Sequence, residues 1–249
     1  MSIHKVTSVT VILKNVNFSF PGASGQAISD VSLEIPSGSS MALIGPSGAG
    51  KTTLANIVMG FLSPASGEVL INGLNPIDFI FRNPGAIGYV PQFPSLIRGS
   101  LAANIALGVP SSQINESSVE QVIRTAQLQD WYDTLANGLA TEIHAKSLSG
   151  GQIQRIGIAR ALYTRPRFLI MDEPTGSLDG KTEKSLTEAL LTARNGMTTL
   201  TIAHRLSTIE SSDSVVYLVE GKVQGLGTLG ELRKENEEVE KLAQQFTLN

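Results

Sequence analysis

The chain has 249 residues, of which 19 are basic and 22 are acidic, and it contains no cysteine. This nearly balanced charge argues against a nucleic-acid partner or an anionic membrane surface, and the lack of cysteine excludes disulfides and thiolate-bound metals. The N-terminal residues lack the apolar core of a signal peptide, and the longest apolar stretch, TTLANIVMGFL, is too short to span a bilayer. We therefore expect a soluble chain that folds as one compact unit with lobes.

The first ninety residues alternate strand and helix patterns. Apolar and polar residues alternate on both sides of the turn PGASG, which predicts two half-buried strands. The strands predicted in this part comprise residues 10–20, 27–35, 41–44, 67–73 and 86–90. The segment KTTLANIVMGFL, residues 51–62, predicts a helix after the third strand. This alternation is typical of an α/β fold.

From about residue 93 to 165 the pattern becomes helical. Apolar residues recur three and four positions apart in the segments 100–107, 118–128 and 150–162. Because this stretch interrupts the α/β alternation, we expect it to form a helical lobe inserted into the α/β core, with Trp131 in the interior of that lobe.

Strand and helix patterns alternate again in the last third of the chain. They predict strands at 167–173, 197–204 and 212–227, a helix at 180–193, and a charged helix from about Leu229 onward. We interpret the charge run RKENEEVEK in that last helix as a solvated face.

The segment GPSGAGKT, residues 45–52, follows an apolar strand and opens a helix, as a phosphate-binding loop requires. Its glycines let successive backbone N–H groups point at one anion, and the following helix adds the positive end of its dipole. Lys51 can reach the β- and γ-phosphates, and Thr52 can place its hydroxyl on Mg²⁺. The residues assigned to the nucleotide here are Gly45, Pro46, Ser47, Gly48, Ala49, Gly50, Lys51, Thr52 and Thr53.

Two adjacent carboxylates end the strand RFLIMDE. Its apolar run predicts a buried parallel strand, which carries Asp172 to the carboxyl end of the sheet, where open α/β sheets bind ligands. Asp172 can hold Mg²⁺, and Glu173 can align and deprotonate an attacking water. Beside the phosphate loop, this pair predicts hydrolysis of a nucleoside triphosphate.

A second glycine loop, LSGGQ, precedes the helix at 150–162 and can present a hydroxyl, N–H groups and a helix dipole to an anion, although a glycine pair is more often a plain turn. Together with the other motifs and their order, it resembles the signature of the nucleotide-binding domain of ATP-binding cassette (ABC) transporters, over about Val11 to Leu242. The resemblance implies one domain over residues 1–249, with a P-loop NTPase (RecA-like) core, an antiparallel β subdomain and an inserted α-helical subdomain.

The resemblance also implies roles for further residues. Two domains of this family associate head to tail, so that Ser149, Gly150, Gly151 and Gln152 would close on the ATP held by the partner. Phe20 matches the aromatic that stacks on adenine, and Gln92 matches the residue that touches Mg²⁺ and the attacking water. Asp179 matches a residue that crosses the dimer interface and also suits a helix cap. His204 matches the histidine that hydrogen-bonds the γ-phosphate.

The function implied by the resemblance is hydrolysis of ATP by a dimer that powers an ABC transporter. GSLAANIALG, AHRLSTIESSDSVVYLVEGKV and the C-terminal segment resemble the exporter type, whose ATPase follows a transmembrane domain, and suggest a domain separated from one. TEIHAKSLSGG and DEPTGSLD depart from that type, and the second resembles stand-alone ATPase subunits.

The expected cofactors are ATP and Mg²⁺. The expected partners are a second copy of the domain and a transmembrane domain in the same or another chain, at the cytoplasmic face of a membrane. The alternative is a stand-alone ATPase subunit of an importer-like or regulatory cassette system. A DNA-repair ATPase is disfavoured because no long heptad insert is present. The transported substrate, the direction of transport and the choice between homodimer and heterodimer stay open.

Overall fold

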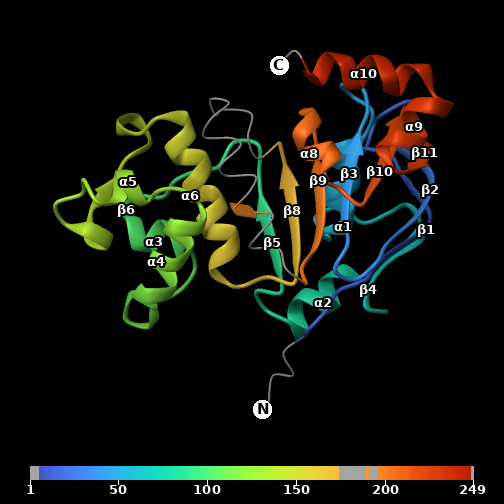
Figure 1. Ribbon diagram of the computed structural model, residues 1–249. Coiled ribbons are helices and arrows are strands. Elements are labelled where there is room, and N and C mark those ends of the chain that lie inside the picture. Colours follow the sequence, from blue (N-terminus) through green and yellow to red (C-terminus); the bar gives the residue numbers. More distant parts are fainter. Residues whose placement is uncertain (1–5, 174–188, 191–195, 248–249) are drawn as a thin grey trace.

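The structure is a computed structural model that describes residues 6–173, 189–190 and 196–247. A mostly parallel sheet forms its centre, a cluster of short helices lies at one edge of that sheet, and an antiparallel sheet lies toward the other (Figure 1). The α/β class predicted from the sequence is confirmed.

The central sheet has the strand order β11-β10-β3-β9-β8-β5. Every residue of β3 and of β8 is buried, as expected for strands covered on both faces. All neighbouring strands are parallel except β11, which forms an antiparallel hairpin with β10 at the edge. The strands are β3 (Ser40–Ile44), β5 (Ile87–Val90), β8 (Phe168–Asp172), β9 (Thr198–Ile202), β10 (Ser214–Val219) and β11 (Lys222–Gly227).

A three-stranded antiparallel sheet of order β2-β1-β4 packs with the central sheet through one shared apolar core. It consists of β1 (Val11–Phe18), β2 (Ile28–Ile35) and β4 (Ser66–Ile71). Buried and exposed residues alternate along β2, so one face of this sheet turns to the core. An Asn-Gly turn follows β4, with both Asn72 and Gly73 at positive φ.

The helices between β5 and β8 build a second apolar core of their own. Trp131 packs against this core as a partly buried residue. The helices are α3 (Leu101–Ile105), α4 (Glu116–Thr125), α5 (Gln129–Tyr132) and α6 (Gly150–Tyr163), joined by three 3₁₀ turns, Ser111–Gln113, Gly138–Ala140 and Ala145–Ser147, and by the two-stranded ladder of β6 (Gly99–Ser100) and β7 (Glu142–Ile143).

Several predicted helix boundaries were wrong. The first helix, α1, spans Lys51–Val58 rather than residues 51–62, because Gly60 adopts a left-handed conformation that ends it. The C-terminal helix is two helices, α9 (Leu229–Glu235) and α10 (Glu237–Thr247), because Asn236 is extended and accepts a hydrogen bond from the Glu238 amide. The helix predicted at 180–193 lies largely outside the described residues.

Two short helices were missed, α2 (Pro76–Arg82) and α8 (Leu206–Glu210). The start of α2 carried a readable signal, because Asn75 caps it and Pro76 occupies its first turn. Among the residues that the structure describes, no helix has the length and hydropathy needed to cross a bilayer.

The close approach of α6 to the loop after β5 generates a stability prediction. A β-carbon added at Gly157 in α6 would lie 2.5 Å from Cγ of Pro94, whereas one added at Gly230 in α9 would meet nothing within 4 Å. We expect Gly157→Ala to lower the free energy of unfolding by about 1–3 kcal/mol through overpacking. Gly230→Ala, the matched control, should be neutral or stabilising by up to about 1 kcal/mol. Urea unfolding of both variants measures this, and equal effects would contradict it.

Candidate nucleotide-binding site

The predicted phosphate loop connects β3 to α1 and depends on glycine at two positions. Gly45 has φ 149° and Gly50 has φ 100°, conformations that side chains rarely adopt. A β-carbon at Gly45 would lie 2.0 Å from the carbonyl oxygen of Leu218, and one at Gly50 would lie 2.6 Å from that of Ala27. The loop therefore packs tightly against β10 and against the chain that enters β2.

Lys51, the first residue of α1, lies buried inside this loop. Its Nζ donates to the carbonyl oxygens of Gly45 at 2.8 Å and Pro46 at 2.9 Å. Burial lowers the pKa of Lys51, while the carboxylates of Glu173 and Asp172 oppose that change. The loop thus holds an amine between its own carbonyls and two acidic side chains.

Asp172 ends β8 at the carboxyl edge of the sheet, where it is buried and faces the first turn of α1. The Thr52 hydroxyl donates to Oδ2 of Asp172 at 3.2 Å. Burial raises the pKa of Asp172, and the hydrogen bond from Thr52 partly offsets this. A hydroxyl and a carboxylate at this separation are hard oxygen donors, which fit Mg²⁺ and not a softer metal.

Glu173 contacts two residues that are distant in the sequence. Nε2 of Gln92 donates to Oε2 at 2.8 Å, and Nε2 of His204 lies 2.7 Å from Oε1. Burial is the main cause that lowers the pKa of His204, and the charge of Glu173 opposes that change. Glu173 also has a positive φ of 47°, which is uncommon for a residue with a side chain.

The structure therefore brings together residues predicted at four separate motifs: the phosphate loop with Lys51 and Thr52, the Asp172–Glu173 pair, Gln92 and His204. These residues follow the carboxyl ends of the parallel strands β3, β5, β8 and β9, which lie at the same edge of the sheet (Figure 1).

Phe20 follows β1 and is 46% exposed. Its ring packs edge to face on Phe18, with 4.9 Å between centroids. The amide of Ala27 bonds to the carbonyl of Phe18, and Ala27 also borders Gly50, so Phe20 is carried on the hairpin next to the phosphate loop. Asp179 lies outside the described residues.

The signature residues lie elsewhere in the chain. Ser149 caps α6: its hydroxyl accepts from the amide of Gln152 at 3.2 Å, and its own amide donates to Oε1 of Gln152 at 2.8 Å. Gly150 and Gly151 form the first turn of this helix. α6 packs against β5, whereas α1 follows β3, and the strands β9 and β8 lie between β3 and β5 in the sheet order. Within a single chain, the signature residues Ser149 and Gln152 therefore cap α6.

Two polar residues on the buried part of α6 were missed by the sequence analysis. Arg160 donates from Nη1 to the carbonyl of Ser95 at 2.9 Å, and Gln154 donates to the carbonyl of Pro91 at 3.5 Å. They hold the segment that carries Gln92. The available signal was the presence of polar side chains among the apolar positions of that helix.

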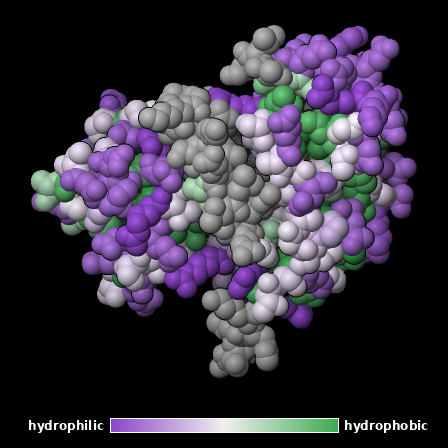
Figure 2. Space-filling view, viewed as in Figure 1, coloured by the Kyte–Doolittle hydropathy of each residue, from purple (hydrophilic) through white to green (hydrophobic). Residues whose placement is uncertain are grey.

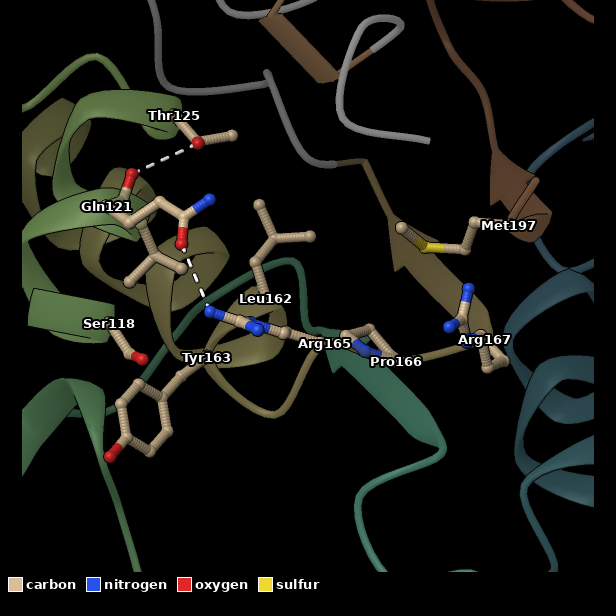
Figure 3. A pocket seen from close by; sticks show the side chains of 10 residues that line it. Ser118, Gln121, Thr125, Leu162, Tyr163, Arg165, Pro166, Arg167 and Met197 are labelled. Carbon is tan, nitrogen blue, oxygen red and sulfur yellow. Dashed lines mark hydrogen bonds between the residues drawn. The ribbon is translucent and has the colours of Figure 1, made fainter. Parts of the chain in front are cut away.

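A cavity of about 320 Å³ lies away from these residues, between α4, the end of α6 and the chain entering β8 (Figure 3). Arg165 and Arg167 line it at the amino end of β8, opposite to Asp172. Arg165 points across the cavity and donates to Oε1 of Gln121 at 3.3 Å (Figure 3). The cavity is therefore separate from the phosphate loop.

The sequence model of the ABC transporter family matches residues 28–176. The chain belongs to this family. It is 42% identical over 231 residues to an ATP-dependent lipid A-core flippase of Cupriavidus metallidurans, covering 91% of this chain and 39% of the flippase. It is 39% identical over 229 residues to ABC transporter B family member 21 of Arabidopsis thaliana, covering 90% of this chain and 18% of that protein.

A solved structure of a bacterial Atm1-family ABC exporter with ATP bound superposes with a TM-score of 0.87 at 34% identity, covering 96% of this chain and 42% of that one. The chain thus spans about two fifths, or less, of the relatives that it matches. The predictions of an ABC family member and of an ABC ATPase domain are confirmed, and the chain corresponds to the ATP-binding domain of these transporters.

The capping box of α6 has a counterpart at α9, where Thr228 and Glu231 make the same pair of bonds. We expect Ser149→Ala and Thr228→Ala each to lower the free energy of unfolding by about 0.5–2 kcal/mol, because each removes a helix cap. Chemical denaturation measures this loss. If the signature also serves a nucleotide, only Ser149→Ala should lower ATP hydrolysis by folded protein. Equal rates of ATP hydrolysis by the two variants would show that Ser149 acts only as a helix cap.

Proposed function

We propose that this chain is the ATPase of an ABC exporter, in which two copies close on ATP and drive a transmembrane partner at the cytoplasmic face of a membrane. One observation carries the proposal: Glu173 directly follows Asp172, accepts a hydrogen bond from Gln92 and lies 2.7 Å from Nε2 of His204. A carboxylate oriented from two sides, next to a buried lysine in a phosphate loop, suits activation of water beside a γ-phosphate.

The chemical step that we assign is in-line attack of water on the γ-phosphate of ATP, which breaks the bond to the β-phosphate oxygen and releases ADP. Glu173 accepts the proton of the water, Gln92 orients the carboxylate, and Lys51 neutralises phosphate charge. The N–H of His204, which contacts Glu173 in this structure, becomes the donor to the γ-phosphate. Phe20 stacks on adenine with its exposed ring.

Thr52, Asp172 and the amide oxygen of Gln92 would hold Mg²⁺. Bound there, the ion supplies charge neutralisation at the β- and γ-phosphates. The hydrogen bond between Thr52 and Asp172 supports the assignment, because it gathers two hard donors at the start of α1.

The second copy completes the site in this proposal. Ser149, Gly150, Gly151 and Gln152 close on the γ-phosphate held by the partner, so the start of α6 adds its dipole to a nucleotide bound in trans. The position of α6 against β5 supports this arrangement, since the strands β9 and β8 lie between β5 and β3 and separate the signature helix from its own phosphate loop.

Exposed apolar side chains in the segments before and after β5 support docking of a transmembrane partner. Phe81 in α2 is 85% exposed and Phe93, next to Gln92, is 75% exposed. Phe61, also exposed, packs edge to face on Tyr89 of β5, the strand that leads to Gln92. Large exposed apolar side chains in a group mark interaction sites. We favour an exporter over a stand-alone ATPase subunit, because the relatives are a flippase and an exporter that carry their ATPase domain in a longer chain.

Glu173→Gln tests the proposed chemistry. Removal of the base while charge neutralisation remains should lower kcat for ATP by at least about a hundredfold and leave ATP binding intact. Size-exclusion chromatography with ATP and Mg²⁺ should show a stable dimer. Glu68→Gln, which alters an exposed carboxylate paired with Lys14, is the control and should keep full turnover. A Glu173→Gln chain that binds ATP yet stays monomeric would contradict the closed dimer.

Mixing two inactive variants tests the action of the signature in trans. Lys51→Ala disables a chain's own phosphate loop, and Ser149→Arg blocks the site that its signature completes. An equal mixture contains about half heterodimers, each with one intact site, so phosphate release should return. Vanadate trapping of ADP provides a second readout if hydrolysis requires both sites. Recovery in neither readout, with heterodimers shown to form, would exclude the trans assignment.

A further inference from the structure

We propose that Phe246 of α10 is a positioning residue for the ATPase reaction: its ring holds the imidazole of His204 at the site, where the imidazole contacts Glu173 in this structure and would donate to the γ-phosphate in the reaction. The inference rests on the proposed function, because it gives His204 a part in hydrolysis. It extends the site to a helix that carries none of the recognised motifs.

The helix α10 is built to lie on the carboxyl edge of the central sheet. Val239, Leu242, Ala243 and Phe246 recur at helical spacing and pack against one apolar cluster that includes Ala203, the neighbour of His204. Figure 1 shows α10 crossing above β3 and β9, beside α8. The outer face of α10 is hydrophilic, which leaves the apolar face for the sheet (Figure 2).

Polar contacts attach α10 to the strand β10 and to the helix α9. The hydroxyl of Tyr217 in β10 donates to Oε2 of Glu238 at 2.7 Å, and Nη2 of Arg233 in α9 donates to Oε1 of Glu240 at 3.0 Å. Burial, together with the bond to Glu238, raises the pKa of Tyr217 to about 12, so its hydroxyl keeps its proton at physiological pH. The helix is thus attached to the core at both its apolar stripe and its first turn.

The contact itself joins Phe246 to the catalytic cluster. The ring centroids of His204 and Phe246 are 5.8 Å apart with an interplanar angle of 72°, an edge-to-face arrangement, while Nε2 of His204 lies 2.7 Å from Oε1 of Glu173. The imidazole is therefore confined between an aromatic ring and a carboxylate. Its side chain is 37% exposed, so other rotamers that point toward solvent are open once the ring is removed.

The same contact keeps water from the imidazole. Burial is the largest cause that lowers the pKa of His204; Lys51 adds to that effect, and the carboxylates of Glu173 and Asp172 oppose it. Loss of the Phe246 ring exposes the imidazole, so the pKa of His204 should rise toward the ordinary value of about 6.5. This change reports on the position of the ring independently of ATP hydrolysis.

The experiment compares Phe246→Ala, Phe246→Leu and Phe246→Tyr in the full chain, with Leu242→Ala as control on the same helix and the same apolar cluster. We expect Phe246→Ala and Phe246→Leu to lower kcat about two- to tenfold with KM for ATP unchanged. The reason is that each variant loses one aromatic contact that affects the reaction and not the binding of ATP. Phe246→Tyr, which keeps the ring, should retain kcat. In a His204→Ala background, Phe246→Ala should cause no further loss, because the two residues act through one contact.

NMR titration of the imidazole protons gives the second readout. We expect a raised pKa of His204 in Phe246→Ala and Phe246→Leu, and an unchanged one in Leu242→Ala. An unchanged pKa in the Phe246 variants, or an equal loss of kcat in Leu242→Ala, would overturn the inference. A different outcome would be a raised pKa of His204 in the Phe246 variants while kcat stays unchanged both in these variants and in His204→Ala. That outcome would support the contact between the two rings but refute the part that we propose for His204 in hydrolysis.

Discussion

The parallel alignment of β3, β5, β8 and β9 is the constraint on which the rest of the site depends. Parallel strands end at one edge of a sheet, so the segments that follow them meet there regardless of their separation along the chain. The phosphate loop follows β3, Gln92 follows β5, Glu173 follows β8 and His204 follows β9. A change in the order or direction of one strand would separate a carboxylate from the groups that orient it.

Burial at this edge sets the protonation of its groups. Burial lowers the pKa of Lys51 and of His204 and raises that of Asp172, and in each case the neighbouring charges or hydrogen bonds oppose part of the change. The resulting set places an imidazole, two carboxylates and an amine in close proximity. An isolated buried charge is costly, so these buried groups require the neighbouring charges and hydrogen bonds that stabilise their charged forms.

Two structural units outside the sheet act on the same carboxylate. α6 holds the segment of Gln92 through Arg160 and Gln154, and α10 contacts His204 through Phe246. The first of these helices begins at the signature Ser149, which we assign to a partner's nucleotide. Both helices are therefore linked to Glu173 through packed side chains and hydrogen bonds.

The sequence by itself determined the buried strands, the phosphate loop, the Asp172–Glu173 pair and the family, because these depend on local patterns: apolar runs, glycines where φ must be positive, and motifs of defined spacing. It failed at the C-terminal end of α1 and at the break at Asn236, where capping geometry and packing outweigh periodicity. Only the tertiary structure decided that Gln92 and His204 both reach Glu173, and that Phe246 reaches His204. These contacts join segments that no local pattern relates, and they arise from strand order and from the seating of one helix on the sheet.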